Sequence, residues 1–161
     1  MKYLILFLFI LANYVPAFPQ GAVNFKIENF INKEYAALEE LYKELHQNPE
    51  LSLQEAKTAK VMATELKRVG FEVTENVGGH GVVGVLKNGK GPTILIRADM
   101  DALPLEEKTG LSYASKAKGV NAAGNQVSIM HACGHDIHMT VFIGTAKSLV
   151  QVKNQWKGTL V

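Results

Sequence analysis

Hydrophobic residues recur every three or four positions between Asn24 and Leu45, with Glu and Lys between them. On an α-helix this spacing places the apolar side chains in one stripe. Pro49 ends the pattern, because a proline inside a helix removes a hydrogen bond and clashes with the preceding turn. The sequence therefore predicts a long first helix. Its apolar stripe consists of Phe25, Ile27, Phe30, Ile31, Tyr35, Leu38, Leu41, Tyr42 and Leu45.

A second helix is predicted to start at residues 52–55. Their sequence, Ser-Leu-Gln-Glu, has the form of a capping box, in which two side chains satisfy free N–H groups at a helix start. Gly70 stands where a helix C-terminus favours glycine. A third helix is predicted from His135 to Val150.

Short β-like segments lie between the predicted second and third helices. The Asn88-Gly89 pair favours a tight turn, so residues 82–86 and 94–96 are predicted to form a hairpin. Residues 93–96 are apolar on both faces, which is typical of a central strand covered on both sides. The β-like segments are residues 71–77, 81–86 and 93–97.

The remaining segments complete the predicted order of elements. Residues 105–126 are polar and predicted to form a loop, and residues 158–161 start a further strand. Helices and strands in this order indicate an α/β layer protein. A strand that stops partway leaves backbone groups without partners, so we expect the 161 residues to be the front part of a longer protein.

Composition favours a globular domain over a disordered chain and gives no sign of a nucleic-acid-binding surface. Of the 161 residues, 47% are hydrophobic and 20% are charged, which suits one domain with its own core. The net charge is +2, and no block of Lys and Arg occurs. We therefore expect no nucleic-acid partner.

The N-terminus has the pattern of a secretory signal peptide. Lys2 precedes an apolar run from Tyr3 to Ala12, and a small residue, Ala17, follows. The run is about half the length that crosses a bilayer as a helix, so no stable membrane anchor is expected. A buried first helix is the alternative. We interpret residues 1–20 as a signal peptide, and the protein as secreted or periplasmic.

The segment from Met130 to His138 concentrates side chains that bind metal ions. It holds the only cysteine, three of the five histidines and an aspartate. Thiolate, imidazole and carboxylate groups bind first-row transition metals. Cys133 and His135 flank Gly134, which allows the backbone to bring both side chains toward one ion. The metal-binding interpretation rests on the whole segment, because each residue also has an ordinary explanation.

Those ordinary explanations stay open at this point. His131 would form a local hydrogen bond, Asp136 would cap a helix, His138 would be a surface residue, and Cys133 would be an inert buried thiol. A redox role for Cys133 is disfavoured, since the chain has no second cysteine to pair with it.

A second acidic cluster follows the apolar segment 93–97. Asp99 and Asp101 would point to the same side if the strand continued. In open α/β sheets, ligands bind at the carboxyl ends of the strands. Alternatively, these aspartates cap a turn or pair with Arg97.

Three segments together, residues 45–52, 97–106 and 130–138, resemble the amidohydrolase family of metallopeptidase and aminoacylase type. Its branch here includes hippurate hydrolases, N-acyl-amino-acid hydrolases, carboxypeptidases and indoleacetyl-amino-acid hydrolases. The resemblance runs from about residue 30 to the last residue. It implies a three-layer metallopeptidase catalytic domain, an α/β fold with helices packed on a mixed sheet, here incomplete at the C-terminus.

The resemblance also implies a reaction and a set of roles. Such an enzyme cleaves the amide bond of N-acyl amino acids or peptides by metal-activated water, using two divalent ions of zinc or manganese per complete site. Cys133 and His135 would be metal ligands, and Asp99 would help to position the active-site loop. Arg97 stands where related branches place a metal-binding histidine, so it is not taken as a ligand. The remaining supporting residues would be Asp101, His131, Asp136 and His138.

The chain departs from the family pattern by what it does not contain. The family's Glu-Glu pair, which supplies the general base, its further metal-binding histidines and its dimerisation domain would all follow Gly158. Residues 21–161 are therefore expected to be the N-terminal part of a catalytic domain, inactive and poorly stable alone. Full-length relatives would dimerise through the domain that is absent here. The alternative is a short non-catalytic product with a binding or regulatory role.

Overall fold

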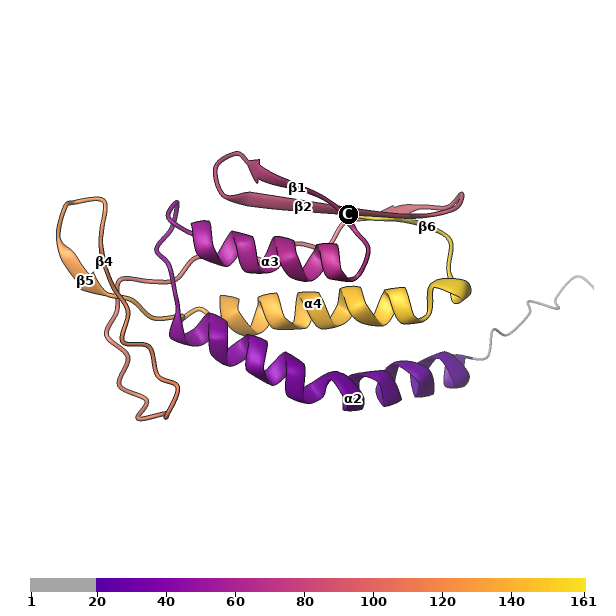
Figure 1. Ribbon diagram of the computed structural model, residues 1–161, viewed down its shortest axis with the longest axis horizontal. Coiled ribbons are helices and arrows are strands. Elements are labelled where there is room, and N and C mark those ends of the chain that lie inside the picture. The colour runs from indigo at the N-terminus through magenta and orange to yellow at the C-terminus, as the bar shows by residue number, and fades with distance from the viewer. Residues whose placement is uncertain (1–19) are drawn as a thin grey trace, which may run out of the picture.

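A computed structural model describes residues 20–161, in which helices pack in layers against one side of a sheet (Figure 1). Helix α2 (Gln20–Gln47) runs along α4 (His135–Gln151). Helices α3 (Ala56–Arg68) and α4 lie between α2 and the sheet (Figure 1). The predicted first and third helices are confirmed. The predicted signal peptide, apart from its last residue, lies outside the described residues.

The sheet contains four strands in the order β1-β2-β6-β3. Strand β2 pairs antiparallel with both β1 and β6, whereas β3 pairs parallel with β6. The predicted α/β class with helices on a mixed sheet is therefore confirmed, as part of a domain. The strands are β1 (Glu72–Val77), β2 (Gly81–Asn88), β3 (Thr93–Ile94) and β6 (Gly158–Leu160).

The predicted hairpin between residues 82–86 and 94–96 is wrong, because β6 lies between β2 and β3. Glycines allow this arrangement. A Cβ on Gly91 would lie 2.5 Å from the carbonyl oxygen of Lys157, and a Cβ on Gly158 would lie 2.3 Å from that of Pro92. The two backbones can approach so closely only without side chains there.

The prediction that residues 93–96 form a doubly covered central strand is also wrong for the described part of the chain. Strand β3 lies at the edge of the sheet there, and Ile94 and Leu95 are 53% and 68% exposed. An apolar run alone does not specify which neighbours cover it.

The predicted capping box at residues 52–55 does not form. Helix α3 begins later, at Ala56, and its N-cap residue Glu55 makes no side-chain capping hydrogen bond. Instead, the Glu50 carboxylate accepts hydrogen bonds from the backbone N–H and the hydroxyl of Thr58, at 2.8 and 2.9 Å. A side chain outside the local motif thus satisfies the first turn of the helix.

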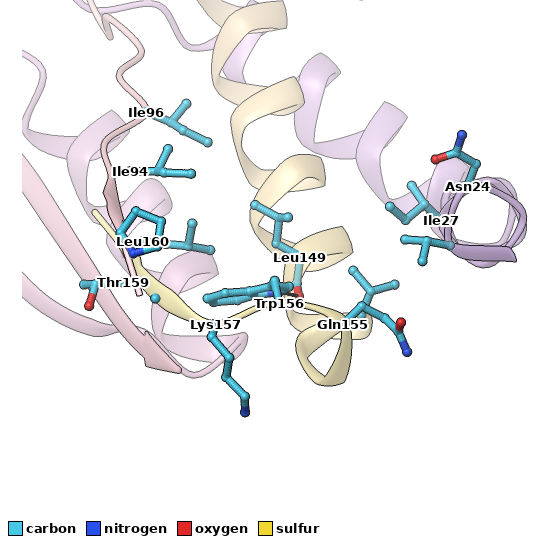
Figure 2. A pocket seen from close by; sticks show the side chains of 14 residues that line it. Asn24, Ile27, Ile94, Ile96, Leu149, Gln155, Trp156, Lys157, Thr159 and Leu160 are labelled. Atoms are coloured by element: carbon cyan, nitrogen blue, oxygen red, sulfur yellow. Dashed lines mark hydrogen bonds between the residues drawn. The ribbon is translucent and has the colours of Figure 1, made fainter. Parts of the chain in front are cut away.

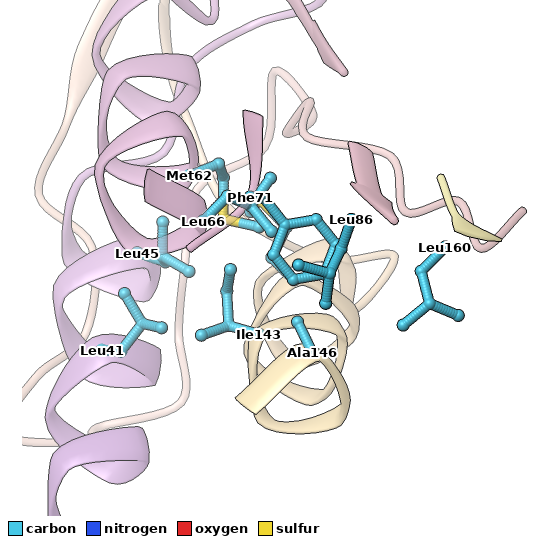
Figure 3. Close-up of a cluster of buried hydrophobic side chains, with 10 residues drawn as sticks. Leu41, Leu45, Met62, Leu66, Phe71, Leu86, Ile143, Ala146 and Leu160 are labelled. Carbon is cyan, nitrogen blue, oxygen red and sulfur yellow. The ribbon is translucent and has the colours of Figure 1, made fainter. Parts of the chain in front are cut away.

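The core lies where the three helices meet the sheet (Figure 3). Met139 and Ile143 of α4 are fully buried at its centre. The predicted stripe on the first helix is too wide, because Phe25 and Tyr35 are 65% and 64% exposed. Other core residues are Leu41, Leu45, Met62, Leu66, Phe71, Leu86, Ala146 and Leu160.

Two further elements lie outside the main sheet. Strands β4 (Lys118–Val120) and β5 (Gln126–Ser128) form a small antiparallel hairpin, of which β4 lies within the segment predicted to be a loop. A short 3-10 helix, η1 (Lys153–Gln155), follows α4. From residue 20 onward, the chain contains no helix with the length and apolar character needed to cross a membrane.

Candidate functional site

The Cys133–His135 segment forms the turn that leads into α4. Gly134 is the N-cap residue and has a left-handed backbone with φ of 75°. Such a backbone favours glycine, which has no Cβ to clash. Cys133 is exposed, so it is not the inert buried thiol of the alternative interpretation. The turn leaves the Cys133 thiol accessible directly before the first residue of the helix.

His135 is held in one orientation by Asp101. Its Nδ1 lies 2.8 Å from the Asp101 carbonyl oxygen and 3.0 Å from a carboxylate oxygen of the same residue. A carbonyl oxygen can only accept, so Nδ1 must carry the proton. In the neutral ring, Nε2 then carries the lone pair that a metal ion requires. His135 therefore has a free coordinating nitrogen.

Asp99, the predicted supporting aspartate, contacts a different partner. Its carboxylate accepts a hydrogen bond from the Arg97 guanidinium at 2.5 Å, with both side chains largely in solvent. This pairing is one of the alternatives that the sequence leaves open. His138 is exposed on α4, and its ring centroid lies 6.1 Å from that of His135. Asp101, rather than Asp99, is the aspartate that contacts a candidate ligand.

A second, buried cluster lies next to this turn. Nδ1 of His46 donates to the Asp136 carboxylate at 2.6 Å, and Nε2 donates to the Glu107 carboxylate at 3.1 Å. Because both partners are carboxylates, both ring nitrogens act as donors and the ring is an imidazolium. The rings of Tyr42 and Tyr113 each pack 5.5 Å from the His46 ring, centroid to centroid.

Opposing effects set the pKa values in this cluster. Burial by itself lowers the pKa of His46, but the hydrogen bonds to Asp136 and Glu107 and their charges outweigh it, and the net shift is upward. Burial tends to raise the pKa of Glu107, but hydrogen bonds from Thr109, Ser115 and His46 bring it below the ordinary value. The cluster is thus stable in its charged form.

His131, a predicted supporting residue, is buried without a hydrogen-bonding partner. It is 5% exposed, and neither ring nitrogen has a partner among the described residues. Burial lowers its pKa by more than the nearby Asp136 carboxylate raises it, so the net shift is downward. The ring is therefore neutral, and the local hydrogen bond of the alternative interpretation does not form.

The donor chemistry of the turn fits a divalent metal ion, although the number of donors is small. A thiolate from Cys133 and Nε2 of His135 are ligands that zinc sites use. Among residues 20–161, no group of three or more His, Cys, Asp or Glu side chains is placed to hold an ion. The described residues thus contribute two candidate ligands.

The sequence assigns no role to His46 or Glu107. A signal for His46 exists, because it follows Tyr42 by four residues and so lies on the same face of the first helix. It also lies in one of the three segments that carry the family resemblance. Glu107 lies in a segment predicted to be a loop, and no local pattern indicates that its side chain is buried.

A separate apolar pocket of about 500 Å³ lies at the other end of α4 (Figure 2). Trp156 and Leu149 line it, facing Ile27 of α2 and Ile94 of β3 (Figure 2). Lys157 is the one titratable residue in this lining. The pocket therefore offers hydrophobic contact but none of the acid, base or metal chemistry of the Cys133–His135 turn.

Comparisons with known proteins agree on one family. Residues 95–161 match the model of peptidase family M20/M25/M40. Thermostable carboxypeptidase 2 of Saccharolobus solfataricus is 39% identical over 137 residues, which are 84% of this chain and 33% of that protein. Hippurate hydrolase of Campylobacter jejuni is 49% identical over 112 residues, 69% of this chain and 27% of that protein.

A solved structure is also similar. The Bacillus subtilis YXEP protein, described as a dinuclear metal-binding peptidase of the M20 family, superimposes with a TM-score of 0.69 at 37% identity. The match covers 80% of this chain and 34% of that one. This chain thus spans about a third of the length of the relatives that it matches.

Proposed function

Because this chain belongs to peptidase family M20/M25/M40, we propose that it forms part of the catalytic domain of a metal-dependent amidohydrolase. The complete protein would cleave the amide bond of N-acyl amino acids or peptides. The names of its relatives, hippurate hydrolase and carboxypeptidase, support this substrate class. Cys133 and His135 would be the ligands that this part of the domain contributes.

The observation that carries the proposal is the fixed tautomer of His135. Its Nδ1–H donates to the Asp101 carbonyl oxygen, which leaves Nε2 free for a metal ion, and Cys133, two residues earlier, is exposed. Histidines that bind metals are oriented in this way by a carbonyl or carboxylate partner. A bound zinc or manganese ion would polarise the substrate carbonyl and lower the pKa of water. Asp101 would keep His135 in the coordinating orientation throughout.

We expect the 161-residue chain alone to show no turnover. Two protein ligands hold a metal ion weakly, since zinc sites in enzymes use three or more. The test is hydrolysis of a hippurate-type substrate with added manganese or zinc. Clear turnover by the purified chain would contradict this expectation.

Cobalt binding tests the proposed ligands directly. A cobalt ion coordinated by a thiolate gives a charge-transfer absorption that histidine and carboxylate ligands do not give. We expect this band in the chain as it stands and its loss in Cys133→Ser, with His135→Ala weakening the binding. Ser112→Ala, an exposed substitution in another loop, is the control. The absence of this band in the unmodified chain, or a cobalt affinity that His135→Ala leaves unchanged, would rule out the proposed centre.

The alternative is a non-catalytic product with a binding or regulatory role, favoured by the small number of ligands in the described residues. Full-size relatives and this chain would then share a groove but not a reaction. Export through residues 1–20 and dimerisation of the full-length protein remain proposals. Export would be tested by cleavage near residue 20, measured as the mass of the secreted chain.

A further inference from the structure

We propose that His46 is a positioning residue for the candidate metal ligands. In this proposal, which rests on the proposed function, the His46 imidazolium bridges Asp136 and Glu107 and thereby fixes the orientation of His135. His46 itself contacts neither candidate ligand in the contacts that the structure gives.

The first step is the direct link from His46 to the turn. Asp136 follows His135 in the first turn of α4, is 2% exposed, and accepts the His46 Nδ1–H at 2.6 Å. The other oxygen of the same carboxylate accepts the Ile137 N–H at 2.9 Å. His46 therefore anchors the first helical turn at the residue next to His135.

The second step concerns the segment around Asp101, which contacts Nδ1 of His135. After His46, the chain leaves α2 and reaches Glu50, whose carbonyl oxygen accepts the Ala102 N–H at 2.8 Å. Ala102 directly follows Asp101, which orients His135. The segment around Ala102 and the segment before Cys133 are joined in turn by the paired backbones of Leu103 and Met130, both hydrogen bonds being 3.0 Å long. The end of α2 is thus attached to Asp136, which follows His135, and to Ala102, which follows the Asp101 that orients the His135 ring.

The third step is Glu107, which closes the bridge. Its side chain is fully buried, and its second oxygen accepts the Ser115 N–H at 2.5 Å. Glu107 therefore ties His46 to the long loop after residue 105. Three segments far apart in the sequence, the end of α2, this loop and the start of α4, converge on one imidazolium ring.

A charged ring is needed for this arrangement, because a neutral histidine donates one hydrogen bond and not two. A glutamine at position 46 would fill much of the same space. Its two N–H groups lie on one nitrogen, so it could not reach both carboxylates as the two nitrogens of the imidazolium ring do. We expect Asp136 and the turn before it to gain freedom in His46→Gln. The Asp101 carbonyl would then hold His135 for only part of the time.

The test uses two readouts, one of them free of metal. Nitrogen-15 NMR of the metal-free chain reports which His135 nitrogen carries the proton. We expect the Nδ1–H form in the unmodified chain and a mixture of both tautomers in His46→Gln. Cobalt affinity, followed by the thiolate absorption, should fall about 10-fold, the range for residues that orient metal ligands.

Two further variants separate positioning from general loosening. Leu41→Ala removes a buried core side chain from the same helix. It should lower stability while leaving the His135 tautomer and the cobalt absorption unchanged. Glu107→Gln keeps an acceptor for His46 and should produce a smaller change in both readouts, which keeps the test available if His46→Gln folds poorly.

The outcomes are distinguishable. If His46→Gln retains the Nδ1–H form of His135 and binds cobalt within about twofold of the unmodified chain, the positioning role is overturned. An equal change in Leu41→Ala would overturn it too. If the unmodified chain gives no thiolate absorption with cobalt, the proposed metal centre fails, and the role of His46 is then judged by the metal-free tautomer alone.

Discussion

Two buried histidines, His46 and His131, differ in their hydrogen bonding and in the direction of their pKa shifts. Each is 5% exposed. His46 donates from both ring nitrogens to carboxylates, whereas His131 has no hydrogen-bonding partner among the described residues. The pKa of His46 is shifted upward and that of His131 downward. Burial alone therefore does not decide the charge of a histidine.

The difference lies in what surrounds each ring. Burial disfavours the charged form in both cases, but His46 has two carboxylates in direct contact and His131 has only more distant charges. A charged ring with two partners joins segments together, and its removal leaves two carboxylates uncompensated. A neutral ring without hydrogen-bonding partners contributes to stability mainly through its packing. The two sites should thus respond differently to substitution, pH and metal.

The largest effect is expected for Asp136→Ala. This change removes the shortest contact of the His46 ring and leaves a buried positive charge with one partner. Breaking a buried ion pair in this way should lower the free energy of unfolding by about 3–5 kcal/mol. Urea unfolding followed by circular dichroism measures it. A loss below about 1 kcal/mol, the range of surface ion pairs, would show that His46 is not charged in the folded chain.

The pH dependence of His46→Gln gives the next largest effect. A histidine whose pKa is raised on folding stabilises the protein fully below its ordinary pKa, and this stabilisation is lost as the pH rises through the folded-state pKa. The cost of His46→Gln should therefore be greater near about pH 6 than near about pH 9. Thermal unfolding of both metal-free chains across that range measures it. A cost that grows with pH would contradict the imidazolium.

Asp101→Ala should separate stability from metal binding. The Asp101 and His135 side chains are 30% and 20% exposed, so their ion pair should contribute no more than about 1 kcal/mol to stability. Metal affinity should fall about 10-fold, since His135 loses the carboxylate beside Nδ1. Unfolding and cobalt titration of the same sample give both values. Glu106→Ala, at an exposed carboxylate a few residues further along the chain, is the control, and it should leave cobalt binding unchanged.

The smallest effect is expected for His131→Leu. Because the ring has no hydrogen bond to lose among residues 20–161, an apolar side chain of similar size should change the free energy of unfolding by less than about 1 kcal/mol at neutral pH. The pKa of His131 is lowered by burial, so its neutral form costs stability as the pH falls below the ordinary value. The leucine variant should therefore become relatively more stable in acid. A large loss at every pH would indicate a bound partner for the ring.

The sequence predicts the parts of this fold that depend on local pattern. The first and third helices and the strand at residue 158 follow from the local pattern of apolar and polar residues. The strand order does not, because β6 pairs with residues far earlier in the chain and displaces the hairpin that Asn88-Gly89 favours. The start of α3 is displaced for a similar reason, since Glu50 accepts the Thr58 N–H in the first turn of a helix that begins at Ala56.

The candidate site shows the same division. Cys133 and His135 are recognisable because metal-binding side chains gather in one short segment. The contact between His135 and Asp101 joins two segments that are far apart in the sequence. The sequence alone does not show whether Asp99 or Asp101 makes such a contact. His46 and Glu107 converge with Asp136 only through tertiary packing. Residues that hold a site in place are thus harder to predict than residues that carry its chemistry.

The position of β6 between β2 and β3 has a consequence for the order in which the chain folds. Leu160 is in register with Leu86 on one side and Ile94 on the other. Neither β2 nor β3 can complete the sheet until a segment made much later reaches the gap between them. Contacts between residues so distant in sequence close slowly, because the entropy of a long loop is lost before any pairing is gained. We expect the β1–β2 hairpin and its contacts with α3 to form early during synthesis, and the sheet to close last.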